Sequence, residues 1–521
     1  MEIETRGRRT NSGGLASRRT GMGRQARLAA RAAAPEINPA PPGPLGGQYL
    51  PLRTGEVDTI IDTAFRILAE IGMGTCPPQL VEAATARGAR YVEGRLFYDR
   101  SFVEDIIDGA AKTFVYHGRD PVHDFEVGGS QVYFGTGGAA VQTKDLDTGL
   151  YRPSTLRDLY DFTRLIDRLD NVAWFTRCCI ATDVADNFDL DVNTAYALLR
   201  GTTKPVGTAF TVGENVDPII DMFDWAMGGE GAFARRPFCK AHISPVISPL
   251  RYGEDAVDVT VACIRRRVPI NAIIAAQSGA TAPATLAGFL AQTTAETLAA
   301  LVLTNVFEPG YPMIFSNWPL TIDLRTGAFA GGSGEIAVLN AGAAQVSNAL
   351  GLPSGVASSM SDAKAVDAQM GAEKALTAVV AGLAGANMVY ESSGMMASLL
   401  GASFEAFVAD DEMLSHVYRV VRGIEVNKES LGFEAIKQAV FGEGHFLGLD
   451  HTMASMQRDY FYPALADRQQ PAVWEETGAS DLATRAQAKA RTILENHHPA
   501  YLDPVIDNQI RERFNILLDT P

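Results

Sequence analysis

The sequence predicts an α/β fold built around a (β/α)8 barrel, and three observations carry this prediction. The chain has 521 residues, which is enough for one large barrel with appendages. Beyond residue 130, short apolar runs alternate with longer stretches of helical periodicity. The runs hardly alternate between apolar and polar residues, as expected for parallel strands that are buried on both faces.

Eight apolar runs are the predicted strands. Eight strand–helix units in succession favour a closed barrel over an open, doubly wound sheet. The runs are Val132–Gly135, Ala173–Ala181, Val206–Thr211, Cys239–Ser244, Ile270–Ala275, Met313–Ser316, Gly355–Ser358 and Asn387–Glu391. The helical patterns between and after them cover Thr155–Leu169, Leu190–Leu199, Asp217–Met227, Glu254–Arg267, Thr285–Val306, Glu335–Leu350, Ala363–Leu383 and Met396–Gly423.

The flanking segments predict a TIM barrel with a small N-terminal α+β appendage and a C-terminal helical extension. Residues 1–50 form an arm and linker that is rich in Arg and then in Pro and Gly. Residues 51–128 mix a helical apolar stripe with a hairpin-like pair, Arg90–Val92 and Leu96–Tyr98. The barrel then occupies 129–423, and 424–521 is expected to pack on it as extra helices.

Composition excludes several classes of partner. The net charge of −16 opposes binding to nucleic acid or to an anionic membrane, and no apolar run is long enough to span a bilayer. Eight Arg and no Lys occur in residues 1–31, without the apolar core of a secretory signal. This arm is either a solvated tail or a basic segment that binds an acidic surface. We expect a cytoplasmic protein that forms a homo-oligomer.

The five cysteines predict reduced thiols and no metal site. They are Cys76, Cys178, Cys179, Cys239 and Cys263, an odd number without a CxxC pair. Cys239 and His242 are the only close Cys–His pair, and two ligands do not make a zinc site. Cys178 and Cys179 are interpreted as small core residues, of which strand geometry sends one inward.

Barrel enzymes place their active sites at the carboxyl ends of the strands, so the residues that follow each run are the candidates. Aromatic rings and carboxylates gather there, and this combination suits a cationic guest, because aromatic faces attract ammonium groups. The predicted catalytic residues are Glu391, Asp362 and His242. The predicted substrate-binding residues are Phe210, Gln277, Asn317, Trp318, Lys364, Tyr390 and Asp183.

Each candidate also has a structural interpretation. His242 can be a hydrogen-bonded core residue, and Trp318 can plug the barrel mouth. Asp362 fits the N-cap of the helix after the seventh strand. Lys364 and Asp367 fit a surface ion pair on that helix. The run Asp410–Glu412 is typical of a solvated helix face.

Three sequence motifs resemble the trimethylamine methyltransferase family. The first is Asp323-Leu-Arg-Thr-Gly-Ala with Gly332-Ser-Gly-Glu335, and the second is Ser361-Asp-Ala-Lys364-Ala-Val-Asp367-Ala-Gln369. The third is Gly444-His-Phe-Leu447 with His451-Thr452, Arg458, Pro463 and Asp467-Arg468. The resemblance extends over nearly the whole chain. It implies a barrel enzyme that moves a methyl group from a methylated amine to the Co(I) corrinoid (cobalamin) of a partner protein, so this chain itself binds no cofactor tightly.

The chain departs from this family at one chemically important point. Members that demethylate trimethylamine use pyrrolysine, whereas ordinary residues occupy the corresponding region near Ser358–Asp362. A quaternary amine such as glycine betaine needs no such activation, because it leaves as a neutral amine. Positioning and electrostatics then suffice for catalysis. The candidates for holding the carboxylate of a betaine are Lys364, His242 and Gln277.

Two other classes of function compete with this one. A Schiff-base lyase or aldolase needs a lysine inside the barrel, and only Lys240, near a strand start, is a candidate. A binder of osmolyte-like cations without catalytic activity would hold a betaine but transfer no methyl group.

Overall fold

A computed structural model describes residues 38–519, so the Arg-rich arm at 1–31 lies outside the described residues. Contacts between Cα atoms divide the chain into two units. One comprises residues 40–424 and 463–521, and the other includes residues 425–462. The domain boundaries inferred from the sequence stay predictions.

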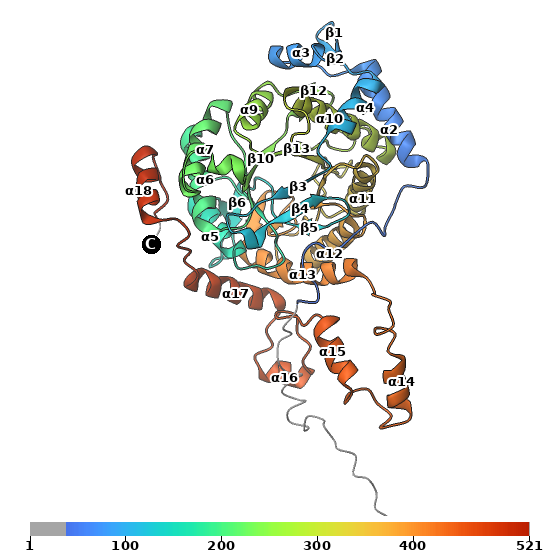
Figure 1. The fold of residues 1–521 in the computed structure, drawn as a ribbon. Helices are drawn as coiled ribbons and strands as arrows, with labels where there is room; N and C mark the ends of the chain where they lie inside the picture. The colour runs from blue at the N-terminus through green and yellow to red at the C-terminus, as the bar shows by residue number, and fades with distance from the viewer. Residues whose placement is uncertain (1–37, 520–521) are drawn as a thin grey trace, which may run out of the picture. The chain divides into compact units, whose positions relative to one another are not determined.

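The larger unit is built around an eight-stranded parallel sheet (Figure 1). The strand order is β5-β16-β15-β14-β13-β10-β9-β8. The amide of Ala173 donates to the carbonyl of Phe134 at 2.8 Å, which joins the segment before β8 to β5 and closes the ring. The strands are β5 (Tyr133–Phe134), β8 (Phe175–Thr176), β9 (Val206–Thr208), β10 (Cys239–Ile243), β13 (Ile270–Ile274), β14 (Met313–Asn317), β15 (Ser354–Ala357) and β16 (Met388–Tyr390). Each predicted run overlaps one of these strands, so the barrel prediction is confirmed.

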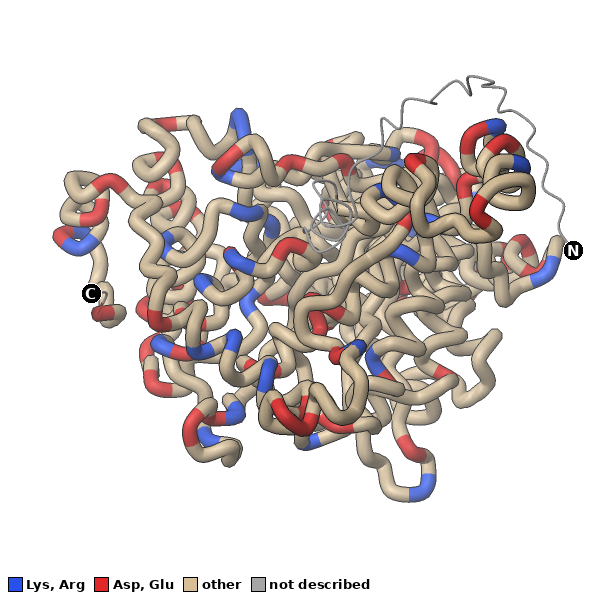
Figure 2. The backbone as a smooth tube through the Cα atoms, turned by 90° about the horizontal axis from the view of Figure 1, so that it is seen from below, with Lys and Arg blue, Asp and Glu red and all other residues tan. Residues whose placement is uncertain are grey.

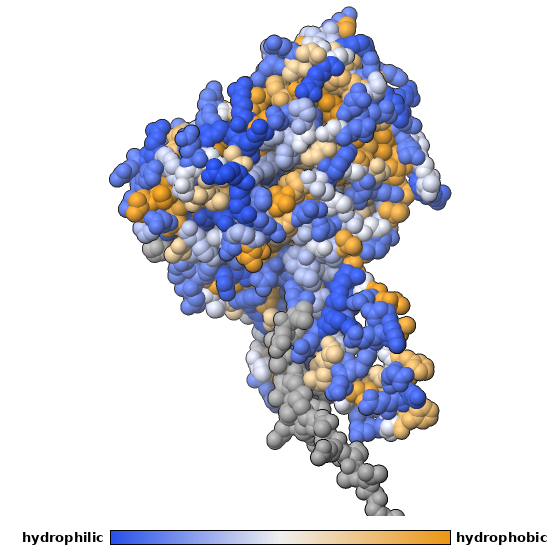
Figure 3. Space-filling model, viewed as in Figure 1, coloured by the Kyte–Doolittle hydropathy of each residue, from blue (hydrophilic) through white to orange (hydrophobic). Residues whose placement is uncertain are grey.

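A ring of helices surrounds the strands (Figure 1). They are α5 (Leu156–Ile166), α6 (Asn187–Gly201), α7 (Val216–Ala226), α9 (Glu254–Arg265), α10 (Leu286–Phe307), α11 (Gly334–Ala349), α12 (Ala368–Leu383) and α13 (Phe404–Arg422), with the short α8 (Ala232–Arg235) after α7. Among the described residues, α10 alone is long and apolar enough to cross a membrane, but 78% of its apolar window is buried in the fold. Charged residues of both signs are interspersed along the chain (Figure 2), and the face drawn in Figure 3 is mainly hydrophilic.

The start of α12 differs from the sequence prediction. The helix begins at Ala368, and its N-cap is Asp367, whose carboxylate accepts from the Met370 amide at 3.0 Å. Asp362 and Lys364 therefore lie in the loop before the helix. The interpretation of Asp362 as the N-cap and that of Lys364 and Asp367 as an ion pair on the helix are both wrong. Asp is a favoured N-cap residue, so Asp362 and Asp367 both suit the cap by residue type, and in the structure Asp367 occupies it.

Short elements precede and decorate the barrel. The N-terminal ones are α2 (Glu56–Arg66), a π-helical turn Ile67–Ile71, α3 (Pro78–Thr85), α4 (Arg100–Gly109) and the hairpins β1 (Arg90–Val92) with β2 (Arg95–Phe97) and β3 (Thr113–Tyr116) with β4 (Phe125–Gly128). Others are the 3-10 turns Pro121–His123 and Gly213–Asn215, and the strands β6 (Gln142–Lys144), β7 (Tyr151–Pro153), β11 (Val246–Ile247), β12 (Arg251–Tyr252), β17 (Met395–Met396) and β18 (Gly401–Ser403). The predicted hairpin at residues 90–98 is confirmed by the pairing of Arg90 with Phe97.

Residues 463–521 belong to the same unit as the barrel. They form α16 (Pro471–Glu476), α17 (Leu482–Asn496) and α18 (Pro504–Arg513). The unit that includes residues 425–462 contains α14 (Phe433–Val440) and α15 (Asp450–Arg458). Most of the third family motif lies in this second unit.

Strand alternation divides the apolar side chains of the barrel into two cores. Val389, Ala241 and Phe315 point outward and join the core beneath the helices. Their neighbours point inward, and the hairpin β3–β4 covers this inner core, since the Phe125 ring lies 4.3 Å from that of Tyr133. The inner core comprises Tyr116, Val127, Tyr133, Trp174, Ile273, Ile314, Trp318, Ile336, Ala357, Met360, Met388 and Tyr390.

Glycine in β15 leaves room for this inner packing. A Cβ added at Gly355 would lie 2.0 Å from the Ser316 Oγ and 2.9 Å from a methyl of Ile314. We predict that Gly355→Ala lowers the free energy of unfolding by about 1–3 kcal/mol, because overpacking displaces both neighbours. Urea denaturation measures the change.

The matched control is Gly371→Ala on the exposed side of α12, where an added Cβ meets no atom within 4 Å. It should raise the free energy of unfolding by roughly 0.5–1 kcal/mol, the helix preference of Ala over Gly. Equal effects of the two substitutions would contradict the packing of the inner core.

Candidate active site

Three aromatic rings meet at the carboxyl ends of the strands. The ring centroids of Trp318 and Tyr390 lie 5.1 Å apart, and that of His242 lies 5.3 Å from Trp318 and 5.8 Å from Tyr390. Tyr390 also packs edge-on against Trp174, with 5.1 Å between centroids. The structure thus brings together three predicted site residues that are at least 70 positions apart from one another in the sequence, as β10, β14 and β16 are close in the barrel.

Lys240 points into the barrel on the same strand as His242, two residues earlier. Its Nζ lies 4.9 Å from the ring centroid of Tyr390 and donates to the Thr176 Oγ1 at 2.6 Å. Burial lowers the pKa of Lys240 to about 7, because it penalises the charged form. The inner rings therefore already accommodate one amine.

Glu391 is buried directly after β16 in a left-handed backbone conformation, with φ 63°. Neither carboxylate oxygen has a hydrogen-bond partner among the described residues. The loop after β5 lies against it, since a Cβ at Gly137 or Gly138 would approach its oxygens to 3.0 and 2.7 Å. Burial raises the pKa of Glu391 to about 8, and the charge of Lys374 opposes this shift. An unpaired buried carboxylate is costly, and strained backbone is common at functional sites.

A buried ion pair holds the loops around Glu391. The Nζ of Lys374 on α12 lies 2.9 Å from the Asp410 Oδ2 on α13, and both side chains are 1% exposed. Lys374 also donates to the Ser359 carbonyl, and Asp410 accepts from the Gly394 amide at 2.7 Å. The pair connects the ends of β15 and β16.

The interpretation of Asp410–Glu412 as a solvated face is wrong, since all three residues are buried. Asp410 pairs with Lys374, and Asp411 accepts from the Asn171 amide at 2.9 Å. Glu412 accepts from the amides of residues 464–466. These partners are distant in sequence, so the local charge pattern gave no sign of them.

His242 is half-buried and neutral. Burial lowers its pKa well below the usual value, and the charges of Lys240 and Arg177 lower it further. The Asn271 Oδ1 accepts from the Ser316 hydroxyl, so its amide nitrogen donates to the His242 Nδ1 at 3.0 Å. The His242 proton is therefore on Nε2.

The remaining candidates lie in different surroundings. Asn317 is buried and its Oδ1 has no partner among the described residues, whereas Phe210 belongs to the outer core. Asp362 accepts from the Gly331 amide at 2.9 Å and the Ser398 hydroxyl at 2.8 Å, which joins three loops at the barrel mouth. Lys364, Gln277 and Asp183 are exposed.

Two of these exposed residues already have structural contacts. Lys364 donates to the Asp362 carbonyl at 2.6 Å, and Asp183 accepts from the Leu156 amide at the start of α5 at 2.8 Å. The functional roles of all the candidates stay predictions.

Arg177 and Lys374 are charged groups near the site that the sequence analysis did not select. Arg177 is a charged residue inside the apolar run Ala173–Ala181, which the sequence analysis assigned wholly to a strand. A charge within such a run could have indicated that the strand ends there. Lys374 carried no signal, because its partner Asp410 is 36 residues away.

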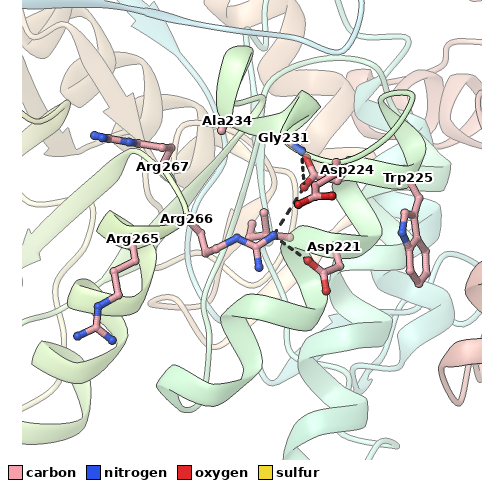
Figure 4. Close-up of a pocket in the computed structure, with 10 residues that line it drawn as sticks. Asp221, Asp224, Trp225, Gly231, Ala234, Arg265, Arg266 and Arg267 are labelled. Carbon is pink, nitrogen blue, oxygen red and sulfur yellow. Dashed lines mark hydrogen bonds and ion pairs between the residues drawn. The ribbon is translucent and has the colours of Figure 1, made fainter.

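A cavity of about 530 Å³ lies on the outside of the barrel, between α7, α8 and the end of α9 (Figure 4). Arg266 crosses it and pairs with Asp221 at 2.8 Å. In a (β/α)8 barrel, the carboxyl end of each helix lies at the face opposite the active site. This cavity is therefore separate from the rings of His242, Trp318 and Tyr390. Among residues 38–519, no group of three His, Cys, Asp or Glu side chains is placed to hold a metal ion.

The fold and the site define a (β/α)8-barrel protein with aromatic rings and a buried carboxylate at its active face. A family model described as trimethylamine methyltransferase (MTTB) matches residues 19–515. The chain belongs to the trimethylamine methyltransferase family and is a methyltransferase, as the sequence motifs predicted.

Individual relatives support a methylated amine as the methyl donor. A trimethylamine methyltransferase from Desulfitobacterium hafniense is 33% identical over 78% of this chain and 82% of its own. A glycine betaine methyltransferase from the same species is 28% identical over 89% of this chain and 97% of its own. A trimethylamine methyltransferase from Methanosarcina barkeri is 31% identical over 86% and 91% of the two chains.

Glu391 generates a prediction about stability and pH. Its folded pKa of about 8 is above the ordinary value of 4.5, so the folded state retains a proton that the unfolded state releases. The contribution of protonated Glu391 to the free energy of unfolding is therefore fully present below pH 4.5 and is lost as the pH rises to about 8. Glu391→Gln should match the native protein near pH 5 and exceed its free energy of unfolding by roughly 2–4 kcal/mol at pH 9.

Urea denaturation across this pH range tests the prediction, with Glu104→Gln, an exposed residue of α4, as the control. A pH-independent difference between the Glu391→Gln variant and the native protein would show that Glu391 is ionised and compensated in the folded state.

Proposed function

We propose that this chain transfers a methyl group from a quaternary methylated amine, such as glycine betaine, to the corrinoid of a partner protein. The observation that carries the proposal is the buried Glu391 carboxylate without a hydrogen-bond partner, next in sequence to a ring of the aromatic cluster. A quaternary ammonium has no N–H to donate. Its positive charge favours the ionised form of the buried carboxylate, and ring faces attract it by roughly 0.5–2 kcal/mol per ring.

The chain's own residues perform binding and positioning. Glu391 supplies the negative charge, and Tyr390 and Trp318 supply ring faces. Their low-dielectric surroundings strengthen the attraction and exclude water from the reacting methyl group. The partner's corrinoid would supply the nucleophile that accepts the methyl group. His242 and Arg177 are only half-buried, so this end of the barrel is partly open to solvent, which the approach of a substrate and a corrinoid requires.

The absence of pyrrolysine from the sequence supports a quaternary substrate. The region near Ser358–Asp362 contains small residues, and the hydroxyls of Ser358 and Ser359 are buried without partners among the described residues. None of these groups can form a covalent adduct that activates a tertiary amine in the way attributed to pyrrolysine. Homo-oligomerisation and a cytoplasmic location remain part of the proposal.

The Schiff-base alternative rests on Lys240, whose pKa of about 7 leaves much of the amine neutral. The side chain is fully buried, and a Cβ at Gly207 would lie 2.6 Å from its Nζ. The amine is thus packed against β9, inside the barrel. Borohydride trapping of a carbonyl compound on Lys240 would revive this alternative.

We predict methyl transfer from glycine betaine to free reduced cobalamin or to a corrinoid protein, and none from trimethylamine. The change in the visible spectrum of the corrinoid measures the transfer. Glu391→Gln should lower kcat/KM for glycine betaine by at least about 100-fold, the effect of removing one buried electrostatic interaction with the reacting cation. Glu104→Gln should leave it unchanged.

Transfer from trimethylamine would contradict the quaternary-amine proposal. Tight binding of glycine betaine without transfer to any corrinoid would favour the non-catalytic binder instead.

A further inference from the structure

Lys240 is a buried amine with few hydrogen-bond acceptors. Two other buried lysines are well supplied with oxygen atoms, since Lys374 pairs with Asp410 at 2.9 Å and Lys204 donates to the carbonyls of residues 166, 169 and 172. Lys240 is 0% exposed, and within residues 38–519 its Nζ donates to one oxygen only, the Thr176 Oγ1 at 2.6 Å. A buried amine with so few acceptors is costly, so other groups must compensate for it.

Three aromatic rings surround the amine in place of acceptors. The Lys240 Nζ lies 4.9 Å from the ring centroid of Tyr390, 5.5 Å from that of Tyr116 and 5.9 Å from that of Trp174. Rings within about 6 Å attract an ammonium group. We call Tyr116, Trp174 and Tyr390 the lower cage. Lys240 precedes His242 by two residues on β10, so it lies roughly 6–7 Å deeper in the barrel, measured from the carboxyl ends of the strands.

The barrel makes room for this amine at one layer of its lumen. Lys240 pairs in register with Gly207 on β9, which pairs in turn with Thr176 on β8. A Cβ at Gly207 would lie 2.6 Å from both the Lys240 Nζ and the Thr176 Oγ1. The glycine therefore leaves the space through which the amine reaches Thr176.

Two rings of the lower cage are fixed by their own polar atoms, and the third is not. The Tyr116 hydroxyl donates to a carbonyl of β9, and the Trp174 Nε1 donates to a carbonyl in the loop after β5 at 3.1 Å. The Tyr390 hydroxyl has only the Met388 sulfur at 3.6 Å, which is a weak acceptor. The orientation of Tyr390 thus depends on the groups that pack against its ring, and Lys240 is one of them.

Tyr390 connects the lower cage to the proposed substrate site. The same ring lies 5.1 Å from that of Trp318 and 5.8 Å from that of His242. Lys240 and a bound ammonium group would therefore share one ring. Because the Lys240 amine already fills the cage, no second cationic group can enter it.

We propose that Lys240 positions Tyr390 and determines the specificity of the substrate site. Its amine fills the lower cage, keeps the Tyr390 ring beside Trp318 and restricts the site to substrates with a single ammonium group. This inference rests on the proposed function and gives a role to a buried side chain that the methyl transfer does not use. It also couples the charge of Lys240 to binding, since an ammonium group in the cage repels a cationic substrate.

Calorimetric binding of tetramethylammonium without any corrinoid tests the positioning role. Lys240→Ala releases the Tyr390 ring and should weaken binding by about 5–30-fold, the effect of losing one or two ring contacts. Ethylamine fits the space of the deleted atoms, so adding it should restore most of the affinity, whereas the branched tert-butylamine should not. Lys240→Met keeps the length of the side chain and its contact with the rings, so it should bind like the native protein near about pH 9. The matched control is Lys437→Met on the exposed side of α14, which should have no effect.

The pH dependence of binding separates the charge of Lys240 from its packing. Burial lowers the pKa of Lys240 to about 7, and the neighbouring Cys239 opposes this shift. The other titratable groups around the amine are uncharged near neutral pH, because burial raises the pKa of Tyr116 and Tyr390 and lowers that of His242. Lys240 therefore gains its charge as the pH falls through about 7. The affinity of Lys240→Met relative to the native protein should rise from about 1 near pH 9 to at least about fivefold near pH 6.

Titration of Glu391 is common to both proteins and cancels in this ratio. A ratio that stays constant with pH would overturn the role of the Lys240 charge, and this measurement does not need a folded Lys240→Ala variant. Circular dichroism confirms the fold of each variant.

Native affinity in the Lys240→Ala variant, or a loss that ethylamine does not restore, would overturn the positioning role. Methyl transfer from glycine betaine with an unaltered KM in Lys240→Ala would also overturn it, and would leave the proposed function standing. Binding of no quaternary amine by the native protein would overturn the role of Lys240 and the proposed function together.

Discussion

The desolvation of charge inside a closed barrel is the constraint on which the active site depends. Strand alternation sends every second side chain into the lumen, where Lys240, Trp174 and Tyr390 have no access to bulk water. The same burial lowers the pKa of Lys240 to about 7 and raises that of Glu391 to about 8. Each unsatisfied charge near this interior is therefore a source of binding energy for a ligand of opposite sign.

The rest of the mouth holds these charges in place. The Lys374–Asp410 ion pair connects the loops after β15 and β16. The Asp362 carboxylate accepts hydrogen bonds from Gly331 and Ser398 and so connects its own loop to two others. The loop after β16 also contains consecutive left-handed residues, from Ala397 to Leu399, in addition to Glu391. Such conformations persist only where the surroundings determine them strongly. The contacts of Lys374, Asp410 and Asp362 thus define the loops around the buried Glu391 carboxyl group.

The sequence predicted the barrel well, because parallel strands buried on both faces leave continuous apolar runs that need no tertiary information. It also located Glu391, Tyr390, Trp318 and His242 at the carboxyl ends of the strands, since a position at or directly after a strand end is enough to place a side chain at that face, and their roles stay predictions. It failed where the deciding contact is distant. Asp410 needed Lys374, and the start of α12 needed the competition between Asp362 and Asp367. Arg177 was hidden because the apolar run continues to Ala181, whereas β8 ends at Thr176.

The buried Glu391 carboxyl group also gives a physical account of turnover. In the proposed reaction, the positive charge of a bound quaternary ammonium favours the ionised form of Glu391 and pairs with it, which offsets the desolvation cost of that carboxylate. Loss of one methyl group converts the ammonium into a neutral tertiary amine and abolishes its attraction to Glu391 and the rings. Glu391 is then unpaired again and, with a pKa of about 8, takes up a proton at neutral pH. The chemistry itself therefore weakens the complex, and release of the amine follows from the transfer that produces it.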